Sequence, residues 1–147
     1  AATTVNLATG AAAKTLSIGS TTTTSRTNIN AGTGSIRFGS GLVVPVTAID
    51  NGDSPYTVLE TDYFISVDSG AGAVTVTLPT AASLAGRTYV IRDMGGAAAV
   101  NNITIGDGGG GNLVGGGASA ASKTLSAAYS GAIVTSDGNL WAYEYIA

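Results

Sequence analysis

Hydrophobic and polar residues alternate along two neighbouring runs in the middle of the chain, residues 60–68 and 73–79. Alternation with a period of two is typical of β-strands that bury one face and expose the other. The apolar positions on the two faces are Tyr63, Ile65, Val67, Val74, Val76 and Leu78. Because Gly70 and Gly72 lie between the runs, we predict that the two runs pair as an antiparallel hairpin.

More strands are predicted towards the C-terminus. Apolar runs continue at 87–93, 102–105, 112–114, 123–129, 131–136 and 140–146. Between the last two runs, Asp137 and Gly138 form a dipeptide that favours a tight hairpin turn. We count eight or nine strands after residue 56 and no convincing helix. The sequence therefore predicts an all-β fold, with a β-sandwich or jelly-roll-like domain over 56–147.

Residues 1–41 differ from the rest of the chain, because they contain short strand-like runs at a nearly fixed spacing. The runs occupy 4–7, 15–18, 27–30 and 35–38, and each is followed by a Gly-bearing turn. Equivalent positions lie 11 residues apart in the first three runs and 9 apart in the last step. Such a period indicates a repeat that is built by stacking. The alternative is a low-complexity Ala/Thr/Gly/Ser linker without fixed structure.

The repeat has too few large side chains to be stable as a single chain. Its large apolar residues are Val5, Leu7, Leu16, Ile18, Ile29, Ile36 and Phe38. Burying them does not offset the conformational entropy that is lost when 41 residues become ordered. Three chains wound around one axis would supply the missing apolar surface and pair the exposed strand edges. We therefore expect an intertwined, homotrimeric β-repeat shaft in which these side chains make the subunit contacts.

The segment 42–55 is expected to connect the shaft with the C-terminal domain. It begins with an apolar run that Pro45 interrupts, and a proline there favours an edge strand or an extended connector. Residues 50–55 are rich in turn-forming types, so we place the domain boundary in them. A surface turn within one continuous domain is an equal alternative.

Several motifs of the C-terminal half resemble a domain found near the C-termini of tailed-bacteriophage fibre and appendage proteins. They lie at 61–67, 74–96, 101–105 and 136–141. The resemblance covers roughly the last ninety residues. It implies a structural or host-contacting domain that is usually trimeric, and it brings no catalytic residues. The N-terminal repeat likewise resembles the intertwined β-shafts of phage fibres.

Composition narrows the function classes. Charged residues make up 10% of the 147 residues, whereas about a quarter is usual in a soluble domain. The net charge of −3 provides no basic surface for binding nucleic acid. The chain contains neither cysteine nor histidine, which excludes zinc sites, thiol nucleophiles and Ser-His pairs within it. No apolar run reaches about twenty residues, so we expect no membrane insertion.

Three residues are candidates for surface binding: Asp107, Asn112 and Tyr145. Trp141, Tyr143 and Tyr145 share one face of the last strand, where they could stack on glycan rings. A tryptophan in a terminal strand is more often part of the core, so we assign Trp141 to the core and Tyr145 to the surface. Asp107 lies in a Gly-rich loop without the spacing of a calcium or phosphate site, and we expect no metal and no cofactor.

The carboxylates do not favour catalysis. Six aspartates flank Gly, Ser or Asn and are explained as turn formers: Asp50, Asp53, Asp68, Asp93, Asp107 and Asp137. That leaves Glu60, Asp62 and Glu144 for a paired-carboxylate mechanism, and we expect no enzyme. Arg87 and Arg92 could contact an acidic partner, but a buried or inter-subunit ion pair with Asp93 or Asp62 is the preferred interpretation.

Together with the resemblance to phage fibre proteins, these features predict a non-enzymatic structural protein of the phage virion. It would act as a homotrimeric fibre or appendage that contacts other virion proteins and a host cell-surface glycan. In this hypothesis the C-terminal domain lies distal to the shaft and binds through loops 106–117 and the Tyr145 end. The alternative is a trimer that decorates and cements the capsid. A carbohydrate-active spike is a third class.

Overall fold

The computed structural model describes residues 27, 29, 35–109 and 112–147, and it divides the chain into two units, Ala1–Leu42 and Val43–Ala147. Four predicted shaft contacts, Val5, Leu7, Leu16 and Ile18, lie outside the described residues. Ile29, Ile36 and Phe38 are described, and all three are exposed. The predicted strand at 35–38 is absent from the described single chain. A strand needs a hydrogen-bonded neighbour, and a lone chain offers none there.

The unit Val43–Ala147 is built from two mixed β-sheets and contains no α-helix among its described residues. The seven-stranded sheet has the order β1 (Val46–Asp50), β3 (Phe64–Asp68), β5 (Thr88–Asp93), β10 (Gly131–Ser136), β11 (Trp141–Ile146), β7 (Leu113–Gly115) and β8 (Ala118–Ala120). The four-stranded sheet has the order β2 (Tyr56–Thr57), β4 (Val74–Thr77), β6 (Ile103–Gly106) and β9 (Ser122–Leu125). Two short 3-10 helices, η1 (Asn51–Asp53) and η2 (Ala81–Ser83), lie in the connections. The all-β character predicted from the sequence is confirmed.

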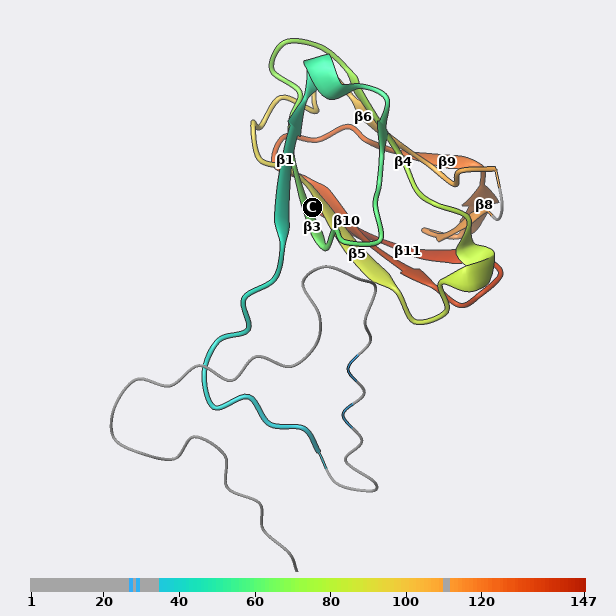
Figure 1. Cartoon of the computed structure of the whole chain (residues 1–147). Helices are drawn as coiled ribbons and strands as arrows, with labels where there is room; N and C mark the ends of the chain where they lie inside the picture. Colours follow the sequence, from blue (N-terminus) through green and yellow to red (C-terminus); the bar gives the residue numbers. More distant parts are fainter. Residues whose placement is uncertain (1–26, 28, 30–34, 110–111) are drawn as a thin grey trace, which may run out of the picture. The chain divides into compact units, whose positions relative to one another are not determined.

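The first six strands alternate between the two sheets. β1, β3 and β5 pair in parallel in one sheet, and β2, β4 and β6 pair in parallel in the other. The chain thus winds from sheet to sheet (Figure 1). The predicted hairpin between 60–68 and 73–79 is therefore wrong, because β3 and β4 belong to different sheets. Alternation shows which face of a strand is buried. The same alternation results whether the next strand hydrogen-bonds beside it in one sheet or lies in the facing sheet.

The second half of the unit reverses direction. β10 is antiparallel to β5, and β11 is antiparallel to β10. Asp137 and Gly138 lie in the turn of this last hairpin, with Gly138 at a φ of 97°, so the hairpin prediction is confirmed. Among the described residues, five of the nine strand pairings are parallel, which departs from the antiparallel sheets of a jelly roll. The predicted strand at 123–129 is shorter than expected, because β9 ends at Leu125.

The segment 42–55, expected as a connector, contributes a strand to the seven-stranded sheet. β1 forms one edge of that sheet, which is the position that Pro45 favours. After β1, the carboxylate of Asp50 accepts a bond from Gly52 N at 2.6 Å, and Asp53 accepts one from Asp50 N at 3.0 Å. This reciprocal cap begins η1 and turns the chain towards the second sheet.

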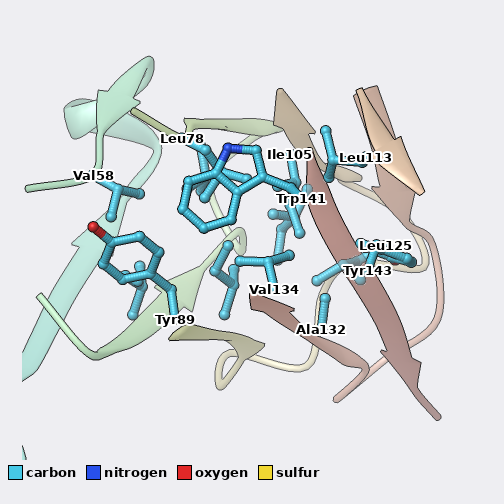
Figure 2. Close-up of a cluster of buried hydrophobic side chains, with 14 of the residues drawn as sticks. Val58, Leu78, Tyr89, Ile105, Leu113, Leu125, Ala132, Val134, Trp141 and Tyr143 are labelled. Carbon is cyan, nitrogen blue, oxygen red and sulfur yellow. The ribbon is translucent and has the colours of Figure 1, made fainter. Parts of the chain in front are cut away.

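The core lies between the inner faces of the two sheets. Figure 2 shows Trp141 there among Leu78, Ile105, Val134 and Tyr89, and the indole is fully buried. The indole Nε1 donates to the carbonyl of Pro79 at 3.1 Å, which satisfies its one polar group. Trp141 is thus a core residue, as predicted.

The direction of the strands defines two ends of the unit. β1, β3 and β5 begin at one end, where Val43–Pro45 leads into β1; we call this the proximal end. They finish at the opposite, distal end, which carries the loops 69–73, 94–102 and 126–130. β11 begins at the proximal end and finishes at the distal end, because it runs antiparallel to β10.

Candidate functional site

The distal end displays large apolar side chains on loops. Met94, Val100, Tyr129 and Tyr145 are exposed at 54%, 85%, 61% and 45%. Tyr145 belongs to the end of β11, and the other three belong to the loops after β5 and before β10. Solvent-exposed aromatic and aliphatic groups on loops that a rigid sheet positions are typical of binding surfaces.

A single buried carboxylate organises this end. Asp93 is the last residue of β5 and is fully buried. Its Oδ1 accepts a bond from Gly96 N at 2.9 Å, and its Oδ2 accepts bonds from Ala98 N and Tyr129 N, both at 3.0 Å. Charge-assisted bonds of this kind are stronger than neutral ones. Asp93 therefore ties the loop that follows β5 to the turn that precedes β10.

Tyr129 has an unusual backbone conformation for a bulky residue. Its φ is 60°, in the left-handed region that favours glycine. Its ring lies across Gly96, where any side chain would collide with the tyrosine ring. The bond from Tyr129 N to Asp93 helps to hold this conformation. The structure thus presents an exposed aromatic ring on a backbone position that a buried carboxylate holds in a strained conformation.

The neighbouring loop 69–73 is fixed to the same end. Asn101 donates from its side-chain amide to the carbonyl of Ser69 at 2.8 Å and to that of Gly70 at 3.3 Å. Asp68 accepts a bond from Gly70 N at 2.8 Å and closes a tight turn. These contacts join the loops after β3 and β5, so the distal surface is one connected platform.

The structure separates the predicted surface-binding residues. Asp107 and Asn112 lie at the proximal end, where Asn112 O accepts a bond from Trp141 N at 3.1 Å. Tyr145 lies four residues further along β11, or roughly 13 Å at ~3.3 Å per residue. The expectation that loops 106–117 and the Tyr145 end form one binding surface is therefore corrected for Asp107 and Asn112, which lie at the end opposite Tyr145. The sequence pattern does not show strand direction, and strand direction places these residues at opposite ends.

Asp107 has a turn-forming role, like the other aspartates. It accepts a bond from the N–H two residues ahead, as Asp50, Asp68 and Asp137 also do. Asp53 accepts a bond from Asp50 N. With Asp93, described above, these are the six aspartates that the sequence predicts to be turn formers. Within the described ranges, no group of three or more His, Cys, Asp or Glu side chains could hold a metal ion.

Asp62 is used to join the two sheets. Its carboxylate accepts bonds from Thr47 Oγ1 at 2.6 Å, Tyr56 Oη at 2.7 Å and Leu59 N at 2.8 Å. Burial acts to raise the pKa of Asp62, but these hydrogen bonds outweigh it and hold the pKa below its usual value. Burial, together with the bond to Asp62, raises the pKa of Tyr56 to about 12. Asp62 thus serves the fold and is not free to pair with Glu60.

Asp62 and Asp93 are satisfied within the chain without an arginine. Hydroxyl and backbone N–H groups satisfy Asp62, and backbone N–H groups alone satisfy Asp93. Within one chain these two carboxylates therefore need no cation, whereas an ion pair of Arg87 or Arg92 between subunits stays a prediction. Arg92 instead lies on the outer face of its sheet, as its alternation with buried Ile91 and Asp93 requires.

Residues that sequence reasoning missed are Met94, Val100 and Tyr129. Tyr129 was assigned to the end of a strand, whereas the structure places it in a loop. The small residues at 126–128 were the available signal, because a run of Ser and Ala provides little to anchor a strand.

No family model matches the chain, and a search of curated proteins finds no significant match. In the part of the chain that the structure describes, no helix has the length and apolar character that a bilayer crossing requires.

Proposed function

We propose that this chain is a structural protein of a tailed-phage virion, a homotrimeric fibre or appendage without enzymatic activity. In this proposal residues 1–41 form the trimeric β-shaft, and the described unit is its β-sandwich-like C-terminal domain. The motifs that carry the resemblance to phage fibre proteins support it. They fall on β3, on β4 to β5, on β6 and on the turn between β10 and β11. The resemblance therefore follows the elements that build the domain.

The exposed apolar residues before the domain support the trimer. Ile29, Ile36 and Phe38 are exposed in the described single chain, although exposure of large apolar groups is unfavourable in water. In the proposed shaft these side chains would be covered by the equivalent residues of two other copies. Val5, Leu7, Leu16 and Ile18 would make the same contacts further from the domain.

The distal end is the proposed host-contacting surface, and Tyr129 is the observation that carries this function. The chain enters the domain at the proximal end, and in this proposal the distal end points away from the shaft. An exposed tyrosine on a backbone that Asp93 holds supplies contact area at a low entropic cost, which suits the stacking of sugar rings. Three copies around an axis would turn weak single contacts into useful avidity. The proposed partner is a repetitive glycan of the host cell surface.

A binding assay with labelled full-length chain tests this function. We expect the wild type to bind susceptible cells, Tyr129→Gly to lose most of the binding, and the proximal-end control Asn112→Ala to bind like the wild type. Glycine suits the positive φ at position 129, so the loop should keep its shape. Binding of the wild type to empty capsids instead of cells would refute host contact and favour capsid decoration. Equal cell binding by all three proteins would show that the distal ring is not involved.

A further inference from the structure

The outer faces of the two sheets carry different kinds of residue. Strand register places short hydroxyl side chains in rows across the four-stranded sheet: Thr57, Thr77 and Ser122 in one row and Thr75, Thr104 and Thr124 in the other. Threonine has a high preference for strands, and its hydroxyl can bond to water. This face is therefore suited to permanent contact with solvent.

One row of apolar residues crosses the outer face of the seven-stranded sheet, whose other outward positions include Ser66, Thr88 and Thr135. The register aligns Val46, Phe64, Val90 and Ile133 in one row across four adjacent strands. Their neighbours along each strand, such as Ile65, Ile91 and Val134, point into the core, so the row points outward. Val46 is 65% exposed, and no residue of the row belongs to the core cluster or packs against it. Ala48, Ala142, Val114 and Ile146 extend the same face.

The size of this face indicates an interface. Five strands spaced ~4.8 Å apart, each about five residues long at ~3.3 Å per residue, span on the order of 400 Å². The apolar row forms a contiguous strip across this area, and contiguous apolar surface on a single chain commonly marks an interaction site. A standard interface buries about 800 Å² per partner, so the face would supply roughly half. Val43, an exposed apolar residue just before β1, is available to enlarge it.

We propose that this face packs against the equivalent face of further copies of this chain, which makes it the subunit interface of the domain. Between its ends the face carries one positive and one negative side chain, Arg92 on β5 and Glu144 on β11. A face with one charge of each sign can complement a rotated copy of itself, because Arg92 of one copy meets Glu144 of the next. The four-stranded sheet would then face solvent.

The place where the preceding segment enters the domain favours a further copy of this chain as the partner over an unrelated protein. The preceding segment enters at Val46, which is itself part of the apolar row. Three chains that leave one shaft would therefore bring three copies of this face together at their β1 ends. This step rests on the proposed trimer, whereas the contrast between the two outer faces does not.

Charge insertion on the two faces of the full-length chain tests the interface. Val90→Asp and Ile133→Asp place a carboxylate on the apolar face, and Thr75→Asp and Thr104→Asp are the matched controls on the other sheet. We expect the wild type and the controls to sediment at three times the 14.3 kDa chain mass. The apolar-face variants should keep the β-sheet circular dichroism signal and need at least tenfold more protein to form trimers. Apolar-face variants as trimeric as the controls, or a folded wild type of 14.3 kDa, would overturn the proposal.

Disulfide cross-linking gives a second measurement that does not depend on the charged variants folding. The chain has no cysteine, so Arg92→Cys with Glu144→Cys introduces the only thiols. Within one chain these positions are separated by β10 and are too far apart for a disulfide. We expect oxidation to link chains into covalent trimers, and the control pair Thr75→Cys with Thr124→Cys to remain unlinked. Cross-linked trimers that bind capsids and not cells would keep the interface and refute the adhesive function. Cell binding without cross-links between chains would keep the adhesive function and refute the interface.

Discussion

Replacing Asp93 by asparagine should loosen the whole distal end, because one carboxylate holds two loops there. The substitution keeps the shape of the side chain but replaces one acceptor oxygen by an NH₂ donor. If the remaining oxygen keeps Ala98 N and Tyr129 N, the N–H of Gly96 is left facing another donor. Losing one bond to a charged group costs about 1.5–3 kcal/mol, and an unsatisfied donor in a buried site adds to it. We therefore expect Asp93→Asn to lower the free energy of unfolding by about 2–4 kcal/mol.

Urea unfolding at one fixed protein concentration measures this change. Trp141 is the chain's single tryptophan and is fully buried, so its fluorescence reports on the domain core. The matched control is Asp107→Asn, since the side chain of Asp107 accepts one bond, from Gly109 N at 2.8 Å, in an exposed turn. Its loss should cost about 0.5–1 kcal/mol. Equal losses for the two variants, within about 0.5 kcal/mol, would refute the role given to Asp93.

Stability should fall at both extremes of pH. A tyrosine in the unfolded chain ionises near pH 10, whereas Tyr56 in the folded chain has a pKa of about 12, so the urea midpoint should decline between these values and Tyr56→Phe should reduce that decline. The lowered pKa of Asp62 predicts a second loss as pH falls below about 4, and a midpoint constant to pH 2 would contradict it. Gly108→Ala should unfold far more easily than Gly109→Ala, because both have positive φ but only at Gly108 would a methyl group strike a neighbouring backbone carbonyl. About 1 kcal/mol is expected for Gly109→Ala and at least 2 kcal/mol more for Gly108→Ala in thermal or urea unfolding. Tyr129→Gly removes left-handed strain and should leave the unfolding free energy unchanged or raise it by about 1 kcal/mol, and a loss above 2 kcal/mol would show that the ring stabilises the fold.

The positions of the strands follow largely from the sequence, because each strand buries one alternate set of side chains. The burial of Trp141 and the turn at Gly138 are local features of this kind, and both were predicted. The pairing of β3 with β5 instead of β4 was not, since both arrangements bury the same residues. The choice depends on how the chain crosses between two sheets, which no local pattern records.

The distal surface could not be predicted for a related reason. Tyr129 is positioned by Asp93, 36 residues earlier, and by the space above Gly96. Asp93 alone resembles an ordinary turn aspartate, and the tyrosine alone resembles a strand residue. Likewise, the separation of Asn112 from Tyr145 follows from the direction of β11, which becomes visible once the sheet order is known.

Locating the two ends of the domain on the virion tests the central proposal most directly. A gold label at the C-terminal Ala147 marks the distal end, and one at the Asn139 turn marks the proximal end. In electron micrographs of particles that contain this chain, we expect both labels on a tail fibre or appendage, with the Ala147 label further from the particle. Labels spread over the capsid surface, or an Ala147 label nearer to the particle than the Asn139 label, would contradict the account.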